Sequence, residues 1–435
     1  MMSLLEKVED FKEFLFVDEL NEKMFQLVDK VKVLEIGKST DGYPIFCARL
    51  GNGNKNALIF GFPHPNEPVG SLTCLSLIKI LLENEKLRKK FTWYIIPCAD
   101  PDGAKLNENW FKGGFTIKKY AYNFYRSKPS IQTEWSFPVE YKDYKFDNPP
   151  ANTSALKNLM EEIKPDLIYP LHNAGFEGAF FYITKPMSEN YYNKIFELCK
   201  SLSIPLNMGE PEAQFIKELK KPIYLEYTFK DYYDYYKSLG KEPKEIFTFG
   251  NNTIGFAQQV NSNVFGLIGE IPYIFDPKIN DVSKTNKTRR VCLSESASLW
   301  NEMIDITKKI LNHDEINKKS IFYDMLKEFI SHVKNSIEIS EKNLKKDKYN
   351  EKATVAEEFS KTVRTRFFCL SYLGEVRRLL LDSDGKEIND LIKEVESKVD
   401  GHLKYIEKNS DYKIIPIRNL VQLQLECLFI SLDYI

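Results

Sequence analysis

Short apolar runs that end at polar or glycine-rich residues dominate the first two thirds of the chain. The runs at 57–62, 91–96 and 167–171 have the length and abrupt ends of buried β-strands. Between the first two runs, apolar residues continue at helical spacing to about residue 84. A strand, a helix and a second strand form a βαβ unit, whose right-handed crossover joins parallel strands. The pattern therefore predicts an α/β fold with a sheet that is parallel at least in part.

The sequence around this unit predicts further elements of the same domain. Apolar runs at 31–36 and 43–50 flank turn residues and predict a β-hairpin. Similar runs at 179–184 and 264–268 predict two more strands. The stretch 105–150 shows little periodicity, so we predict a long irregular excursion, and excursions of this length usually carry function.

Beyond about residue 285 the pattern becomes helical throughout. Glycine and proline are scarce there, and apolar residues recur at helical spacing in five segments: 299–311, 321–339, 355–381, 388–406 and 417–430. We therefore predict two domains. Residues 1–312 form the α/β domain, in which residues 1–30 are a helical N-terminal cover, and residues 313–435 form an all-helical C-terminal domain.

Composition and charge narrow the possible partners. The chain has 435 residues, of which 43% are hydrophobic, and 61 basic side chains balance 62 acidic ones. This balance does not favour nucleic acid or an anionic membrane as a partner. Acidic residues interrupt the N-terminal apolar positions, and no later run has the roughly 18 apolar residues of a membrane span. Seven cysteines occur singly, as reduced thiols do. We predict a cytoplasmic protein without nucleic-acid or membrane partners.

Two histidines stand at the ends of predicted strands. The chain has five histidines, and only His64 and His172 lie outside the predicted helical domain at 313–435. Glu67 follows His64 closely, just before Pro68 can begin a helix. A catalytic zinc site uses three nitrogen or oxygen ligands and keeps one open position. A lone H-x-x-E is a common coincidence on surface helices, but the shared strand-end setting favours one Zn²⁺ on His64, Glu67 and His172.

Glu270 is the candidate catalytic base. It follows the apolar strand predicted at 264–268, where a charge is unfavourable unless it has a partner or a catalytic role. A glutamate beside a metal-bound water can take a proton from that water and pass it to a leaving amine. The alternative interpretation of Glu270 is a carboxylate held in a structural ion pair.

Four short motifs resemble, in order and approximate spacing, those of the zinc carboxypeptidases of the carboxypeptidase A type, the M14 metallopeptidases. These motifs are His64-Pro65-Asn66-Glu67, Pro101-Asp102-Gly103, His172 and Glu270. The likeness covers about residues 30 to 285. It implies an α/β fold whose mixed, largely parallel twisted sheet has eight strands and is flanked by helices. It also implies the zinc ligands named above, Glu270 as the general base, and an arginine that holds the substrate's free carboxylate.

Arg126 is the residue that best matches this arginine. It falls near the place of the family's asparagine/arginine segment, and it could bind a terminal carboxylate bidentately with help from Asn123. Two alternatives stay open for Arg126: a role at the oxyanion, for which the family uses another arginine, and a structural ion pair. The other candidates for the oxyanion are Asn107, Asn109 and Lys112.

The sequence departs from the family pattern in two further places. Asp100 stands where the family has an asparagine before P-D-G. Residues 247–249 contain no tyrosine where the family has one, so one of the six tyrosines between 224 and 236 is the candidate to close over a substrate.

Together these features predict a zinc-dependent metallocarboxypeptidase that hydrolyses the C-terminal amide bond of peptides through a metal-bound water, with Glu270 as general base. One alternative is a zinc-dependent deacylase of small N-acyl amino acids, similar to the aspartoacylases, which use a comparable metal triad. Another is a non-catalytic module that binds a peptide tail. The predicted partners are accordingly a peptide or a small acyl-amino acid, and a second copy of the chain bound through the C-terminal helices.

Overall fold

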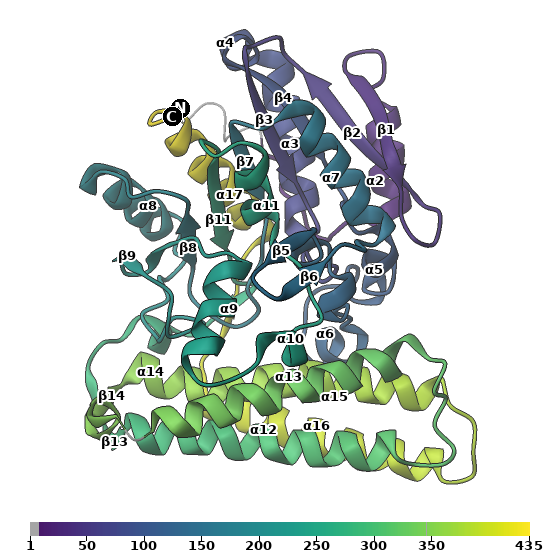
Figure 1. The fold of residues 1–435 in the computed structure, drawn as a ribbon, viewed down its shortest axis with the longest axis vertical. Helices are drawn as coiled ribbons and strands as arrows, with labels where there is room; N and C mark the ends of the chain where they lie inside the picture. Colours follow the sequence, from purple (N-terminus) through teal and green to yellow (C-terminus); the bar gives the residue numbers. More distant parts are fainter. Residues whose placement is uncertain (1–7, 345) are drawn as a thin grey trace.

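The structure, a computed structural model, describes residues 8–344 and 346–435 (Figure 1). It has two layers. A twisted β-sheet with helices on both faces makes up the upper part of Figure 1, and a row of long helices lies beneath it. This arrangement confirms the predicted α/β class followed by a helical C-terminal region.

The main sheet has nine strands among the described residues, in the order β1-β2-β4-β3-β7-β11-β8-β10-β9. In chain order they are β1 (Lys32–Lys38), β2 (Pro44–Leu50), β3 (Lys55–Phe60), β4 (Phe91–Ile96), β7 (Leu167–Pro170), β8 (Phe180–Ile183), β9 (Glu218–Lys220), β10 (Ile223–Leu225) and β11 (Phe265–Glu270). The central neighbours β4, β3, β7 and β11 are parallel, and β8 runs antiparallel to β11. The family resemblance implied eight strands. The three-residue strands β9 and β10 are too short to give a periodic signal in the sequence.

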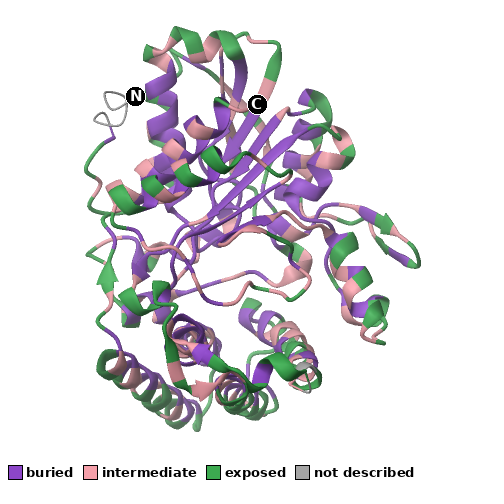
Figure 2. Ribbon diagram, turned by 90° about the vertical axis from the view of Figure 1, so that its left-hand side faces the viewer, coloured by how far each residue is buried: buried purple, intermediate pink, exposed green. Residues whose placement is uncertain are grey.

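Strand β3 shows why the central strands are apolar at every position. Ala57 and Ile59 belong to the core on one face of the sheet, whereas Leu58 and Phe60 belong to the core on the other. Helices α3 (Val69–Glu83) and α17 (Ile417–Leu432) contribute to the first core, and α7 (Ala151–Ile163) and α11 (Thr253–Val260) contribute to the second. Because both faces are covered, successive residues of the central strands are buried. Figure 2 shows these strands coloured as buried.

The stretch 105–150, predicted to be irregular, contains short elements. They are α6 (Ile117–Asn123), three 3₁₀ turns, and the hairpin of β5 (Val139–Tyr141) and β6 (Tyr144–Phe146). A short helix, α5 (Pro101–Lys105), precedes them. Each of these elements spans two turns of helix or less, or three strand residues, which is too short for hydrophobic periodicity to reveal.

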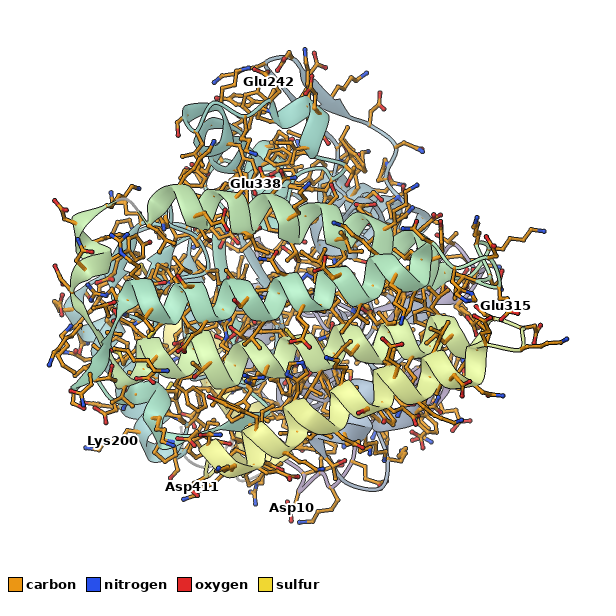
Figure 3. All side chains as sticks on the ribbon, turned by 90° about the horizontal axis from the view of Figure 1, so that it is seen from below. Asp10, Lys200, Glu242, Glu315, Glu338 and Asp411 are labelled. Atoms are coloured by element: carbon orange, nitrogen blue, oxygen red, sulfur yellow. The ribbon has the colours of Figure 1, made fainter. Side chains whose placement is uncertain are left out.

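Five helices form what we call the helical layer: α12 (Arg289–Leu311), α13 (Ile321–Asn343), α14 (Val355–Phe359), α15 (Thr365–Leu381) and α16 (Ile388–Asn409). A π-helical turn at 360–364 joins α14 to α15. Seen from below, the four long helices run side by side across the underside of the sheet domain (Figure 3). Four of the five predicted helical segments fall in this layer.

The fifth segment, α17, leaves the helical layer and returns to the sheet. It packs on α3 and on α8 (Glu189–Ser201). Conversely, α12 lies before residue 313 but packs on α13 and α15. The boundary at 312/313 therefore stays a prediction, because an amphipathic pattern shows that one face of a helix is buried but not which element covers it.

The predicted N-terminal cover contains helix α2 (Val17–Phe25), which packs on β2 and α5. The part of the cover before residue 8 lies outside the described residues. Within 8–344 and 346–435, no helix combines the length and the apolar character that crossing a bilayer would require. All seven cysteines lie in these ranges and are buried free thiols.

Candidate active site

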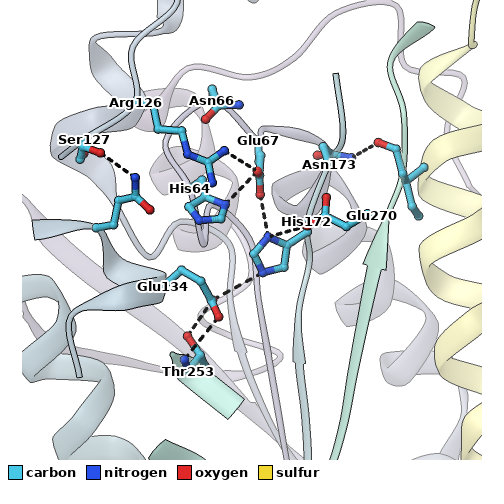
Figure 4. Close-up of polar contacts among 12 residues, drawn as sticks. His64, Asn66, Glu67, Arg126, Ser127, Glu134, His172, Asn173, Thr253 and Glu270 are labelled. Atoms are coloured by element: carbon cyan, nitrogen blue, oxygen red, sulfur yellow. Dashed lines mark hydrogen bonds and ion pairs between the residues drawn. The ribbon is translucent and has the colours of Figure 1, made fainter. Parts of the chain in front are cut away.

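The four residues predicted at strand ends meet at one edge of the sheet (Figure 4). His64 lies in the turn after β3, and Glu67 lies just before α3. His172 follows β7, and Glu270 is the last residue of β11. Since β3, β7 and β11 are parallel neighbours, their carboxyl ends lie together, which is where open α/β sheets bind ligands.

His64, Glu67 and His172 form a compact buried triad. His64 Nδ1 lies 2.9 Å from Glu67 Oε1, and His172 Nδ1 lies 3.1 Å from Glu67 Oε2. One candidate ligand atom from each residue lies within 4.8 Å of the others, and in the described ranges no other three His, Cys, Asp or Glu residues meet this criterion. The two histidine rings are 4.9 Å apart in an edge-to-face arrangement. The three side chains are therefore close enough to share one metal ion.

The chemistry of the triad fits Zn²⁺. Two imidazoles and one carboxylate are the donor types of catalytic zinc sites. Within the described residues, His64 Nε2 is buried without a hydrogen-bond partner, as expected of an atom that can bind a metal ion. Burial and the nearby Arg126 guanidinium lower the pKa of His64 to about 4, which favours the neutral imidazole that binds metal.

The charges around His172 also point to a bound cation. Burial lowers the pKa of His172, but the carboxylates of Glu67, Glu134 and Glu270 outweigh burial and raise the pKa well above the usual value. The carboxyl of Glu270 lies 3.7 Å from His172 Nδ1, and burial together with nearby Glu67 raises the pKa of Glu270 well above its usual value. A surplus of buried carboxylates is stabilised by positive charge, which a divalent ion can supply.

Contacts around the triad orient His172. Its Nε2 lies 3.5 Å from Glu134 Oε2, and Thr253 Oγ1 donates a 2.7 Å hydrogen bond to that same oxygen. Its backbone carbonyl accepts a 3.1 Å hydrogen bond from Gln424 Nε2 on α17. Carboxylates bonded to metal-binding histidines fix the ring orientation. Sequence reasoning missed Glu134 and Gln424, because the first lies in the aperiodic stretch and the second on a helix without strand-end signals.

Arg126 reaches the triad, whereas Asn123 does not. Arg126 Nη1 lies 3.5 Å from Glu67 Oε1, and the side chain lines the cavity beside the triad. Figure 4 shows Arg126 and Glu134 on opposite sides of the two histidines. Asn123 Nδ2 donates instead to the carbonyl of Lys119 in its own helix, 2.9 Å away. The predicted substrate contact of Asn123 therefore has no support from the geometry and stays a prediction.

The cavity beside the triad has a volume of about 400 Å³ and two kinds of wall. From the sheet domain, Glu134, Glu270 and two tyrosines of the predicted 224–236 cluster, Tyr227 and Tyr232, face the cavity. From the helical layer come five further lining residues: Met325, Phe329, His332 and Ser336 on α13, and Tyr372 on α15. The helical layer is thus part of the site.

A buried His-Glu-His cluster with the half-buried Glu270 beside it, at a cavity near the carboxyl ends of parallel strands, is an arrangement typical of metal-dependent hydrolases. The model of the zinc carboxypeptidase family (peptidase family M14) matches residues 16–175, which include the complete triad. Over these residues, which make up less than half of the sequence, the chain is similar to this family of metallopeptidases.

Solved structures show a weaker likeness. Carboxypeptidase A from Helicoverpa armigera is 15% identical, with 60% of this chain and 65% of that chain covered and a TM-score of 0.38. A metallo-carboxypeptidase from Burkholderia cenocepacia is 14% identical, with 62% of each chain covered and a TM-score of 0.36. Both TM-scores are low, so the likeness to the family rests on the family model and on the site. None of the curated proteins compared with the chain matches it significantly.

Proposed function

We propose that this protein is a zinc-dependent metallocarboxypeptidase that hydrolyses the C-terminal amide bond of peptides. The observation that carries the proposal is the convergence of His64, His172, Glu270 and Arg126 on one cavity of about 400 Å³. His64, Glu67 and His172 would hold the ion. A zinc ion bound there supplies Lewis acidity, which polarises a carbonyl group and lowers the pKa of water.

Glu270 acts as the base in this proposal. Its carboxylate accepts a proton from the attacking water as the water oxygen bonds to the amide carbon. It returns the proton to the leaving nitrogen as the carbon–nitrogen bond breaks. The raised pKa of Glu270 suits this exchange, because a carboxylate of higher pKa is a stronger base.

Arg126 would stabilise the negative charge that develops on the carbonyl oxygen. Its guanidinium lies beside Glu67, so it can donate hydrogen bonds at the reacting centre. This position favours the oxyanion role over the carboxylate-binding role that the sequence suggested first. Lys128 lines the same cavity and can pair with the substrate's terminal carboxylate.

A deacylase of small N-acyl amino acids is a second candidate, and one observation favours it. Four side chains of α13 close one side of the cavity, whose volume lies near the lower end of the roughly 300–1,000 Å³ typical of small-molecule sites. A compact substrate would fit this space better than a long peptide.

The experiment combines metal analysis with two substrate panels. Purified protein is analysed for zinc and then assayed on peptides that differ in the C-terminal residue and on N-acyl amino acids. We expect about one zinc per chain and faster hydrolysis of the peptides. Faster hydrolysis of the acyl-amino acids would select the deacylase instead.

A variant tests the base. Glu270→Gln should lower kcat by about 10²- to 10⁴-fold while zinc stays bound, because Gln cannot accept the proton. Glu407→Gln, at an exposed position on α16, is the matched control and should keep full activity. A Glu270→Gln protein as active as the parent, or a parent that binds no zinc, would refute the mechanism.

A further inference from the structure

Asn107 of the sheet domain anchors the backbone of the loop that carries Arg126. Tyr125 N donates a 3.0 Å hydrogen bond to Asn107 Oδ1, and Asn107 Nδ2 donates a 2.9 Å hydrogen bond back to the Tyr125 carbonyl. Asn107 is fully buried and follows α5. One side of the loop after α6 is therefore fixed to the sheet domain.

Helix α15 of the helical layer holds the other side of the same loop. Arg378 Nη1 donates hydrogen bonds of 3.1 Å to the carbonyls of both Asn123 and Phe124. Arg126 N donates a 2.8 Å hydrogen bond to Glu375 Oε1. Of the four successive residues 123–126, the first two and the last are thus bonded to α15, and Tyr125 is bonded to Asn107. A segment bonded on both sides cannot shift unless α15 moves with it.

Helices α6 and α15 also pack so closely that their backbones touch. A Cβ atom placed on Gly374 would lie 1.7 Å from the backbone carbonyl oxygen of Ala121 in α6, so no larger residue fits. Tyr120, next to Ala121, stacks on Phe367, about two turns before Gly374 in α15, with ring centroids 5.6 Å apart. The backbones of α6 and α15 are therefore in direct contact just before the loop begins.

We propose that α15 is the element that positions Arg126, with Glu375 and Arg378 as positioning residues. They hold the backbone at 123–126 so that the Arg126 guanidinium stays beside Glu67 and the cavity. This inference rests on the proposed role of Arg126 in hydrolysis. It assigns a task to the helical layer, which lies outside the residues that the family model matches.

Glu375 suits this task in either protonation state. Its side chain is completely buried, and burial raises the pKa of its carboxyl well above the usual value. The backbone N–H of Arg126 needs only an oxygen that accepts, which a carboxylate, a protonated carboxyl and a glutamine all provide. Glutamine should therefore replace Glu375 in this role, and methionine should not.

Four variants and an activity assay test the proposal. Glu375→Met removes the acceptor at similar volume, and Arg378→Lys shortens the side chain and replaces the guanidinium with an ammonium that reaches less far towards the two carbonyls. Both should lower kcat/KM for peptide about tenfold or more, because small misplacements of a catalytic group are costly. Glu375→Gln and the matched control Arg377→Lys, whose guanidinium bonds to Glu396, should stay within about twofold of the parent. Zinc content should be equal in all.

A double-mutant cycle separates positioning from general stability. If Glu375 acts through Arg126, Glu375→Met should cause no further loss of kcat/KM in an Arg126→Ala background. A merely structural role would lower activity by the same factor in both backgrounds, and that result would overturn the proposal.

Amide hydrogen exchange provides a readout without substrate. Exchange at residues 123–126 should become faster in Glu375→Met and Arg378→Lys and should be unchanged in Arg377→Lys. Unchanged exchange in both test variants would refute the positioning role. An inactive parent with the expected exchange pattern would refute the proposed function alone. If Glu375→Met does not fold, Arg378→Lys still decides the outcome.

Discussion

Asp100 offers a quantitative test of the local electrostatics beside the site. It caps the N-terminus of α5, where its Oδ1 accepts a 3.1 Å hydrogen bond from Gly103 N–H. Its Oδ2 is buried without a hydrogen-bond partner among the described residues. Burial raises the pKa of Asp100 to about 7, although the Gly103 N–H opposes this shift. Near neutral pH Asp100 is therefore close to half protonated and resembles the asparagine of the family pattern.

The perturbation is Asp100→Asn, which replaces the titrating carboxyl with a neutral group of the same shape. An unfolded aspartate has a pKa of about 3.9, so the folded state binds the proton more tightly by about three pKa units. The stability that protonation contributes is complete below about pH 3.9 and is lost as the pH rises through about 7. Three units correspond to about 4 kcal/mol. Asparagine does not titrate and loses nothing over this range.

The assay is urea unfolding of the parent and of Asp100→Asn at several pH values from 5 to 8. We expect the variant to gain stability relative to the parent as the pH rises, with the difference growing towards about 4 kcal/mol above pH 7. Asp384→Asn, at an exposed position, is the control and should show no such trend. A difference that stays constant from pH 5 to 8 would show that folded Asp100 is already ionised and would refute this reasoning.

Three further predictions test separate parts of the molecule. Burial and nearby Arg366 lower the pKa of His402 to about 4, so the parent should lose about 3 kcal/mol relative to His402→Gln as the pH falls from 7 to 4, measured by urea unfolding. Gln424→Met deprives the His172 carbonyl and the Thr73 hydroxyl of their partner, and should lower the free energy of unfolding by about 2 kcal/mol; an unchanged urea midpoint would contradict this. Glutamates line the cavity, so kcat/KM should be higher for peptides ending in lysine or arginine than for those ending in aspartate or glutamate, and the reverse ranking would contradict this.

The strand-end residues could be found from sequence because the central strands are buried on both faces. Runs such as 57–62 are apolar at consecutive positions, so the point where each run stops is sharp. Strands β3, β7 and β11 are parallel neighbours, which brings those end points together. The βαβ rule predicts that such strands run parallel, so that their carboxyl ends lie at one edge of the sheet. His64, His172 and Glu270 were therefore predictable as neighbours before any coordinates were known.

The walls of the cavity were not predictable in the same way. Met325, Phe329, His332 and Ser336 recur at helical spacing, so the sequence shows that they share one face of α13. The sequence does not show what that face covers, since a dimer interface and a second core would need the same pattern. Contacts between elements far apart in the chain depend on how the layers pack, and no local pattern records that.

Some of these contacts can be detected in the sequence, because they require residues that are unfavourable in the secondary structure where they occur. Gly374 lies in the middle of α15, where glycine destabilises a helix by about 1 kcal/mol relative to alanine. Glu375 beside it is a carboxyl in a buried position, which is unfavourable without a partner. Both residues are explained by the same neighbour, the α6 segment that leads to Arg126: Gly374 allows the close approach, and Glu375 accepts the hydrogen bond from the Arg126 N–H. Consecutive residues that conflict with an otherwise regular helix therefore mark the place where that helix serves the site.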